Sequence, residues 1–496
     1  MKCKIIQQLK TAEFRRKIGT VLLFIISFLF VLYQLVQRGT MIDISGDASE
    51  AWKAITTFGT EAPYPSYVLY KGFAAIYPYV WLYKLALILN VNQFFFVMCY
   101  HALLFSYIVF IGIPVLVETL TEYKSKLWQK MLLFVVLYWF WGRYYVLSQL
   151  MVDLPSCAYF FMAIHCAVLI EKYVKWKRNA IIILTGLFCG LIANISGQYS
   201  ISAICIIIFS SVHIWKNTSY SFYKASKIKK CFPMLVGLLI AMFSVGLLKV
   251  WFNIKVLEPF AAQGIVIKSG EAWMERALFY MLDIGRKFYG PDLVDPRGNA
   301  IVMSIYGDKG QELLEQAAAG QYGWTIAQYF KAFVQYPLDF IMLYLNRFII
   351  MISDDSGWCS LRSLLPSYSM IYLAILTCVK RIKKVRDVFK AKTWLVLACL
   401  ASIIPTLVMC VEIRVTISFQ ALFFGVALVG PILPATWNTV CDGVKQCWRE
   451  KSLCSIMEKG FPWGLFGWLV FCLVCLAYFG AICAGSEMGT HMLYKW

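Results

Sequence analysis

Charged residues are scarce in this 496-residue chain, at 15% of the sequence against about 25% in an average soluble domain. Residues of the AVILMFWYC set make up 60% of the sequence, and the mean hydropathy is +0.67. A soluble domain needs a polar surface that this composition does not supply. A soluble globular enzyme is therefore excluded.

Histidine is also rare, with four residues, and no two of them have the H-x-x-x-H or H-E-x-x-H spacing of a zinc site. The chain has no P-loop, no G-x-G-x-x-G and no G-x-S-x-G sequence. We therefore expect no nucleotide cofactor, no serine-hydrolase mechanism and no zinc centre built from histidines. Most of the 17 cysteines lie in apolar runs, where they serve as small apolar residues, and no disulfide framework is indicated.

Long apolar runs, in contrast, recur along the whole chain. A helix needs about 20 mostly apolar residues to cross a bilayer, and eleven runs approach or reach that length. The predicted fold class is all-α, a polytopic transmembrane helical protein of about 11 spans with outer interfacial helices. The predicted spans are 18–37, 94–117, 131–149, 153–171, 180–194, 198–215, 232–252, 366–379, 393–411, 414–434 and 462–484.

The net charge of +20 is divided unevenly by these spans. With a cytoplasmic N-terminus, the inner segments hold 29 of the 47 Lys and Arg residues and 8 of the 27 acidic residues, and the rest of the chain nets −1. Lys and Arg in short loops stay on the cytoplasmic side, so topology explains the charge. We predict a multi-pass plasma-membrane protein that is surrounded by membrane lipids, has its active site on the outer face and binds no nucleic acid.

Two further apolar stretches, 66–89 and 337–353, would reverse the charge bias of the later loops if they crossed the membrane. Both are rich in Tyr, Trp and Phe, so we predict that they form helices at the outer interface. The predicted organisation is an N-terminal transmembrane module at 1–252 with a first outer loop at 38–93, an outer amphipathic helical region at 253–365, and C-terminal transmembrane helices at 366–496.

Carboxylates gather just after the first predicted span, in MIDISGDASEAW, where Asp43 comes first. Asp47 and Glu50 are three residues apart, so a helix that starts near Ser45 or Asp47 places them on one face. A carboxylate at the membrane surface can act as a general base or bind a divalent cation. The alternative is that Asp47 caps the interfacial helix that follows.

Asp153 stands where the fourth predicted span begins, with Pro155 two residues later. Carboxylates at the rim of a membrane helix are costly and often functional. The predicted topology puts Asp153 on the same outer face as Asp47. The alternative is again capping, which is ordinary for an Asp at a helix start.

Several basic residues are candidates for binding a phosphate on the outer side. Glu412 and Arg414 lie in VMCVEIRVTISF, a tight hairpin between two spans that holds both charges at the rim. The Arg414 guanidinium can contact a phosphate through its fork of donors, or it can pair with Glu412. Weaker candidates, for which snorkelling is the alternative, are Arg347, Lys268 and Arg143.

Three stretches resemble GT-C type membrane glycosyltransferases, the group that includes protein O-mannosyltransferases and aminoarabinose transferases. The run SGDASEAWKAITTFGTEAPYPSYVLY is similar to their first outer loop, in which a carboxylate after the first span precedes a Pro-Tyr element, here at 63–65. The run FVQYPLDFIMLYLNRFIIMIS resembles a late outer segment, and VEIRVTISFQALFFGVALVGPIL resembles a late span with an Arg-Tyr element. Val415 stands where the family often has Tyr.

This resemblance implies a glycosyltransferase that uses a polyprenyl-phosphate sugar as donor and a glycan, lipid or protein of the cell envelope as acceptor. It gives Asp47 the role of catalytic base, with Asp43 as its competitor. Asp153 is then the second acidic position, which binds substrate or, together with Asp47, a divalent cation such as Mg²⁺ or Mn²⁺. Further substrate contacts would come from Glu50, Arg414, Glu412, Arg347, Lys268 and Arg143.

Two other activities fit the same layout. A polysaccharide polymerase or ligase also has many spans and a large outer loop, but such sites use outer Arg and His, and His is scarce here. A transporter or flippase for a lipid-linked or small solute is the second alternative. Transporters often show internal repeats and helices broken at matching positions, and no repeat is evident in this sequence. The glycosyltransferase is therefore the leading hypothesis.

Overall fold

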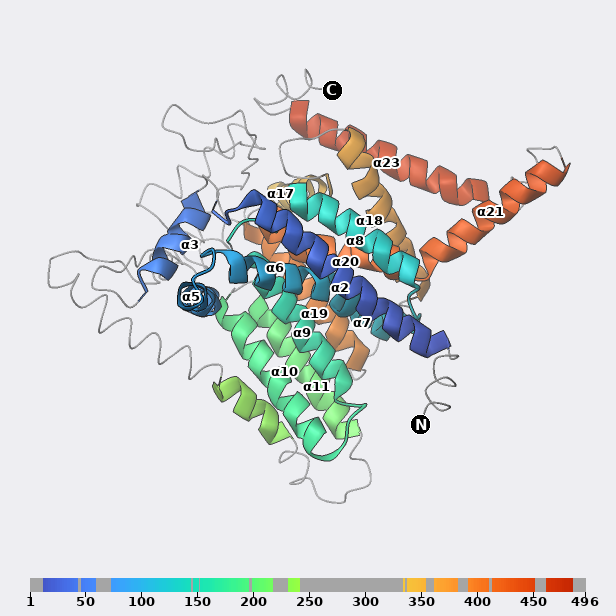
Figure 1. Cartoon of the computed structure of the whole chain (residues 1–496). Coiled ribbons are helices and arrows are strands. Elements are labelled where there is room, and N and C mark those ends of the chain that lie inside the picture. Colours follow the sequence, from blue (N-terminus) through green and yellow to red (C-terminus); the bar gives the residue numbers. More distant parts are fainter. Residues whose placement is uncertain are drawn as a thin grey trace. The chain divides into compact units, whose positions relative to one another are not determined.

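The computed structural model is helical (Figure 1). Every regular element within the described residues is a helix, which confirms the all-α class for that part of the chain. The described residues are 12–42, 46–58, 73–143, 146–150, 152–195, 199–216, 231–240, 333–334, 337–353, 361–381, 391–409, 413–450 and 461–484.

The chain divides into two compact units. Unit 1 comprises Met1–Gly270 and Lys384–Ser402, and unit 2 comprises Glu271–Lys383 and Ile403–Trp496. The helices of unit 1 are α2 (Ala12–Arg38), α3 (Gly46–Thr56), α5 (Phe73–Ile88), α6 (Phe95–Tyr107), the π-helix η1 (Ile108–Gly112), α7 (Ile113–Thr121), α8 (Leu127–Arg143), α9 (Asp153–Leu169), α10 (Lys175–Ile195), α11 (Ser200–Lys216) and a short helix at Cys231–Ile240. Those of unit 2 are α17 (Pro337–Ile352), α18 (Leu361–Arg381), α20 (Ile413–Val429), α21 (Ile432–Glu450) and α23 (Phe461–Ala484), while α19 (Ala391–Met409) contributes residues to both units.

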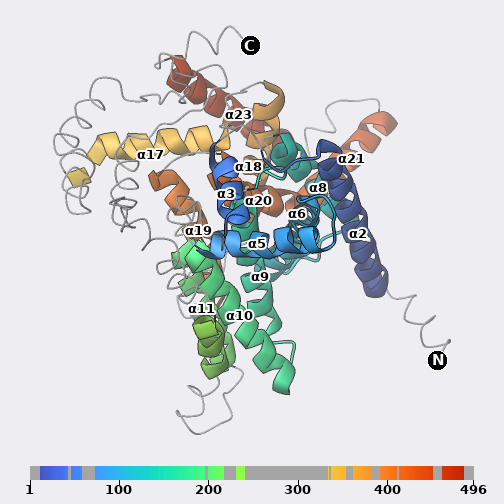
Figure 2. The ribbon, with the colours of Figure 1, turned by 60° about the vertical axis from the view of Figure 1, so that its left-hand side comes forward.

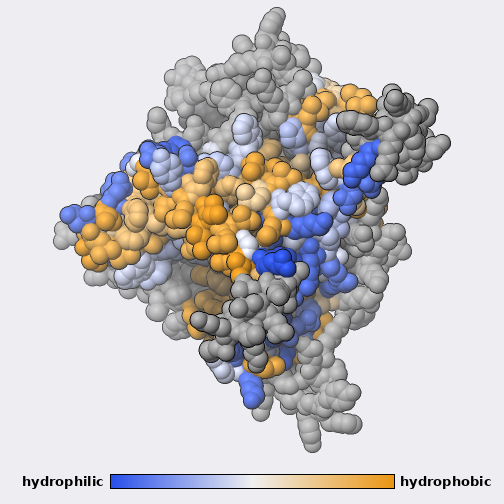
Figure 3. All heavy atoms as spheres, turned by 45° about the vertical axis from the view of Figure 1, so that its right-hand side comes forward, coloured by the Kyte–Doolittle hydropathy of each residue, from blue (hydrophilic) through white to orange (hydrophobic). Residues whose placement is uncertain are grey.

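Several helices are suited to a lipid environment. Among the described residues, four helices are long and apolar enough to cross a membrane. Eight further apolar helices are shorter, with 10–17 residues. Large apolar side chains such as Val21 and Ile26 of α2 are 57% and 59% exposed, and Figure 3 shows apolar residues gathered over a broad area of one face. Such a surface is unfavourable in water and natural in lipid. The four long helices are Glu13–Arg38, Phe95–Thr121, Lys175–Ile195 and Ile417–Asn438.

The two stretches predicted to lie at the outer interface contain α5 and α17. Each of these helices has 16 residues, which corresponds to about 24 Å at 1.5 Å per residue. The hydrocarbon core of a bilayer is about 30 Å thick. The predicted spans α9 and α11 have 17 residues, so length does not separate α5 and α17 from them, and the interfacial placement stays a prediction. Residues 253–332, most of the predicted outer helical region, lie outside the described residues, and the total of eleven spans remains a prediction.

The centre of unit 1 is the continuous helix formed by α6, η1 and α7. It packs against α2 and against α9, and its residues Phe105 and Ile108 are fully buried. The Phe105 ring meets Trp141 of α8 edge to face, with 5.6 Å between the ring centroids. Helices α9, α10 and α11 run side by side (Figures 1 and 2). This packed core fixes the ends of α2, α8 and α9, where the candidate residues lie.

A π-helical turn interrupts the central helix just before Pro114. Proline has no N–H, so the carbonyl of Phe110, four residues earlier, loses its usual helical donor. The Lys130 ammonium lies 3.5 Å from that oxygen and 3.2 Å from Thr20 Oγ1. Lys130 is only 6% exposed. The buried lysine thus satisfies a carbonyl that proline has freed, which gives it a structural role.

Two glycines allow a close helix contact in unit 1. A methyl group at Gly186 of α10 would collide with the backbone oxygen of Met234, and one at Gly237 would collide with that of Ile183. Small residues that let helix backbones approach in this way are typical of membrane helix pairs. The contact fixes the short helix Cys231–Ile240 against α10.

Unit 2 is organised around α18, which packs against α20 and α23. The Trp468 indole N–H of α23 donates to Ser369 Oγ at 2.9 Å, and the Tyr372 hydroxyl donates to the Gly464 carbonyl at 3.2 Å. Hydroxyl groups in apolar surroundings need such partners. These hydrogen bonds hold α23 along one side of α18.

Candidate functional site

The first outer segment after α2 forms helix α3. Asp47 is the second residue of this helix and Glu50 the fifth, so the predicted helix that carries both carboxylates is confirmed. Residues three apart share one face of a helix. Asp47 lies in the first turn, where an acidic residue interacts favourably with the helix dipole. Asp43 lies outside the described residues.

Packing against α5 fixes the position of α3. The indole of Trp52 lies 4.4 Å from the ring centroid of Phe94 and 5.2 Å from that of Tyr83. On the same helix Ala51 and Ile55 are buried. Aromatic contacts of this kind add to the energy of area burial. The Asp47-bearing helix is therefore packed against other parts of unit 1.

A buried turn at residues 146–150, which we name the rim turn, lies between α8 and α9. Loops seldom lie buried, because each backbone N–H and C=O then needs a partner inside the protein. Three contacts with residues outside the turn are the Leu150 N–H to the Met41 carbonyl at 3.0 Å, the Leu147 N–H to the Trp141 carbonyl at 3.4 Å, and Arg38 Nη1 to Ser148 Oγ at 2.5 Å.

The rim turn joins two segments that carry candidate carboxylates. On one side it is bonded to Arg38 and Met41, which lead along the chain into α3 and Asp47. On the other side the chain continues from the rim turn into α9, whose first residue is Asp153. Met41 and Leu150 are about 100 residues apart in sequence and meet at this turn. The structure thus brings together the backbones that lead to Asp47 and Asp153.

Asp153 opens α9 and is half-buried. The N-cap position before the helix is occupied by Val152, and Asp153 is the first residue of the helix. Pro155 follows in the first turn, where a missing N–H costs nothing. Asp153 lies at the start of α9, close to the rim turn. This end of α9 is predicted to face the outer side of the membrane.

A buried histidine also contacts the rim turn. His101 of α6 has no exposed surface, and its Nδ1 lies 3.0 Å from the Leu147 carbonyl oxygen. Its Nε2 lies 2.8 Å from the hydroxyl of Tyr79 on α5. Neither His101 nor Tyr79 is a candidate from the sequence, because an isolated His or Tyr in an apolar run has no distinctive spacing. Both ring nitrogens of His101 are engaged within the protein.

Arg347 of α17, in unit 2, is fully buried. Its Nη1 donates to the carbonyl of Leu407 at 2.7 Å, in the last turn of α19, where helical donors are missing. A cation at this end of a helix also complements the dipole. Its guanidinium lies 6.0 Å from the Tyr344 ring; burial raises the pKa of the Tyr344 phenol and Arg347 partly offsets this. Arg347 is thus buried at a helix end, and the snorkelling alternative is wrong.

The other basic candidates are known only from their places in the chain. Arg143 is the last residue of α8 in unit 1, and Arg414 lies in the first turn of α20 in unit 2. Lys268 and Glu412 lie outside the described residues. Their contacts with a ligand therefore remain predictions.

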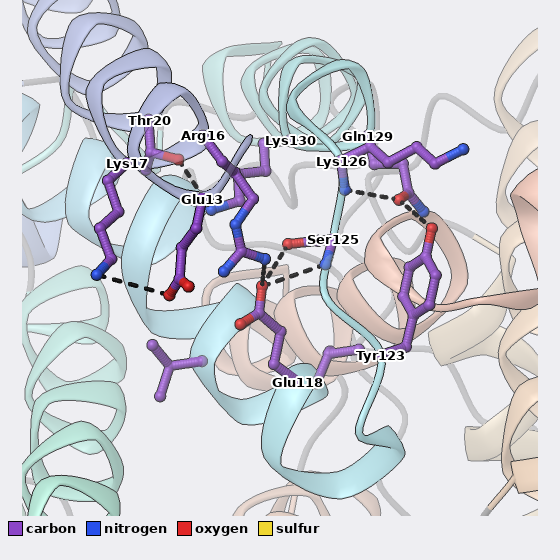
Figure 4. A network of polar contacts seen from close by, with 12 residues as sticks. Glu13, Arg16, Lys17, Thr20, Glu118, Tyr123, Ser125, Lys126, Gln129 and Lys130 are labelled. Atoms are coloured by element: carbon purple, nitrogen blue, oxygen red, sulfur yellow. Dashed lines mark hydrogen bonds and ion pairs between the residues drawn. The ribbon is translucent and has the colours of Figure 1, made fainter. Parts of the chain in front are cut away.

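A separate polar cluster ties the start of α2 to the loop between α7 and α8 (Figure 4). Glu118 Oε1 accepts hydrogen bonds from Arg16 Nη1 at 3.3 Å, from the Ser125 N–H at 3.2 Å and from Ser125 Oγ at 2.9 Å. Burial raises the pKa of the neighbouring Tyr123 phenol, whose hydroxyl donates to Gln129 at 3.0 Å. Ser125 and Gln129 are fully buried. The cluster is closed by its own contacts, which indicates a structural role.

A divalent cation at Asp47 and Asp153 stays a prediction. Mg²⁺ and Mn²⁺ take several oxygen ligands at once. Within the described residues no three His, Cys, Asp or Glu side chains lie together as a metal centre would need. The C-x-x-C pair Cys472 and Cys475 lies on α23 as buried free thiols.

The helices and their exposed apolar side chains define a class of protein, a helical membrane protein. No protein-family model, no curated protein sequence and no solved structure matches this chain.

Proposed function

We propose that this chain is a membrane glycosyltransferase that moves a sugar from a polyprenyl-phosphate donor to an acceptor of the cell envelope on the outer face of the plasma membrane. The observation that supports this most is the rim turn, which joins the backbone leading to Asp47 with the backbone leading to Asp153. Two carboxylates near one membrane rim suit acid–base chemistry on a sugar whose lipid tail lies among apolar helices.

In the proposed reaction, Asp47 accepts the proton of the acceptor hydroxyl while the hydroxyl oxygen attacks the anomeric carbon of the sugar. The bond between that carbon and the phosphate oxygen breaks, and polyprenyl phosphate leaves with the bonding electrons. The configuration at the anomeric carbon is inverted. Asp153 binds a hydroxyl of one substrate, and Asp43 is the competing candidate for the base. Cleavage of the sugar–phosphate linkage supplies the free energy for the transfer, so no nucleotide is required.

The described histidines bear on the competing activities. A polymerase or ligase site of the kind considered above uses outer His, and both nitrogens of His101 are occupied within the protein. His165 is bonded to the Tyr107 hydroxyl at 2.9 Å, and His213 is paired with Glu171. The three described histidines are thus bonded within the protein, and His491 lies outside the described residues.

The proposal is tested by reconstituting the purified chain in liposomes that contain polyprenyl-phosphate sugars. Mass spectrometry of lipid-linked sugars and of envelope glycans, from cells with and without the protein, identifies donor and acceptor. Loss of a lipid-linked sugar together with gain of a glycosylated acceptor supports the proposal. Movement of the intact lipid across the bilayer without sugar transfer would instead support a flippase.

The proposed orientation can be tested separately with reporter fusions. A reporter that works only in the cytoplasm is expected to be active when it is fused at residue 385. A reporter that works only after export is expected to be active when it is fused at residue 300. The physical reason is the concentration of Lys and Arg in 380–392, which holds that segment inside. The opposite pattern would contradict the topology and, with it, an active site on the outer face.

Arg414 is proposed to bind the phosphate of the lipid donor. Arg414→Ala is expected to raise the KM for the donor about 10-fold, because a hydrogen bond to a charged group contributes about 1.5–3 kcal/mol. The melting temperature in detergent is expected to change little. Arg414→Lys, which keeps the charge and loses the fork of donors, is the matched control and should recover part of the affinity. A parallel loss of melting temperature and activity would favour the ion pair with Glu412.

A further inference from the structure

The bonds of His101 fix its protonation state. The Leu147 carbonyl can only accept a hydrogen bond, so Nδ1 of His101 carries the proton and donates it. A charged ring would be costly at a site with no exposed surface, so the ring is neutral and Nε2 accepts from the Tyr79 hydroxyl. His101 therefore links α5, α6 and the rim turn in one fixed arrangement.

We propose that His101 is a positioning residue that holds the rim turn against the end of α2, so that the segments bearing Asp47 and Asp153 stay at one rim. The structural part of this inference stands on the hydrogen bonds alone. Its catalytic consequence rests on the proposed glycosyltransferase function.

The hydrogen bond from His101 to the Leu147 carbonyl matters for the whole rim turn because of the position of Leu147 in it. It lies next to Ser148, which accepts from Arg38, and three residues before Leu150, whose N–H donates to Met41. Without the His101 donor, the buried Leu147 carbonyl has to move toward another donor or water. Such a movement shifts the contacts with Arg38 and Met41 together. A misplacement of about 1 Å can lower a rate about 100-fold without affecting substrate binding to the same degree.

The two side-chain amides provide a matched pair of variants at His101. The amide nitrogen of Asn occupies the place of Nδ1, so His101→Asn retains the donor to Leu147 and loses the contact with Tyr79. The amide of Gln reaches the place of Nε2, so His101→Gln retains a partner for Tyr79 and loses the donor to Leu147. Tyr79→Phe removes the same second contact as His101→Asn and leaves the first intact.

The experiment measures amide hydrogen exchange in the peptide that covers 146–152 together with kcat and KM for sugar transfer, on the full chain in lipid nanodiscs. His101→Gln is expected to raise exchange in this peptide and to lower kcat about 100-fold with KM changed less than 3-fold. His101→Asn and Tyr79→Phe are expected to stay close to the wild-type chain in both measurements.

Equal behaviour of His101→Asn and His101→Gln would overturn the inference, because only one of them keeps the Leu147 donor. Ser148→Ala provides a second test in case the His101 variants do not fold, because it removes the hydrogen bond between Arg38 and the rim turn. It is expected to raise exchange in the same peptide and to lower kcat, and wild-type values for both would also overturn the inference. If the wild-type chain transfers no sugar, the proposed function fails, while the exchange measurements still decide the role of His101.

Discussion

Asp47→Asn is expected to lower sugar transfer by a factor of about 10²–10⁴, the usual contribution of a positioned general base. Asn has the shape of Asp but cannot accept the proton of the acceptor hydroxyl. Asp47 lies in the first turn of α3, which is held by Trp52 against α5, so we expect expression and membrane insertion to stay normal. Transfer from a defined polyprenyl-phosphate sugar in liposomes is the measurement, with single-turnover kinetics to isolate the chemical step.

Two control variants define what the result means. Glu122→Gln removes a carboxylate that pairs with Lys392 and is 80% exposed, on the side predicted to be cytoplasmic, so it should leave transfer unchanged. Asp43→Asn tests the competing base, and a loss confined to this variant would move the base from Asp47 to Asp43. If Asp47→Asn and Asp43→Asn both keep the full rate of sugar transfer, neither aspartate is the base.

The helices were predictable from the sequence because a local pattern determines them. Apolar runs gave α2, the α6–α7 helix and α23 within a few residues, and the spacing of Asp47 and Glu50 anticipated α3. The π-helical turn was not predicted. Pro114, which follows the turn, is visible in the sequence, but Lys130, which lies near the Phe110 carbonyl, comes from another helix.

The arrangement of the candidate site was less predictable, since it depends on contacts between distant parts of the chain. The pairs Met41 with Leu150 and His101 with Leu147 join backbone carbonyls to partners 46 or more residues away. A backbone carbonyl has no identity in the sequence, so no pattern indicates which one needs a donor. The same reason explains Arg347, whose Nη1 donates to the carbonyl of Leu407.

The largest stability effect is expected at the cluster shown in Figure 4, in the variant Glu118→Ala. The change leaves the Ser125 N–H and hydroxyl without their acceptor in a fully buried position, and it removes the carboxylate that pairs with Arg16. Removing one partner of a buried pair costs about 3–5 kcal/mol. The Glu118 and Arg16 side chains are 27% and 24% exposed, so we expect a loss of about 3 kcal/mol in the free energy of unfolding.

Glu13→Gln is the matched control, because it removes a carboxylate from the same end of α2. Glu13 pairs with Lys17 at 3.6 Å, one helical turn away, and both side chains are more than half exposed. An exposed pair of this kind contributes about 0.3–0.5 kcal/mol, so the melting temperature should hardly change. Glu118→Gln keeps an oxygen that can accept from Ser125 and should fall between the two variants. Thermal unfolding in one detergent compares all three, and equal destabilisation by Glu13→Gln and Glu118→Ala would show that charge at this end of α2 matters more than the contacts of Glu118.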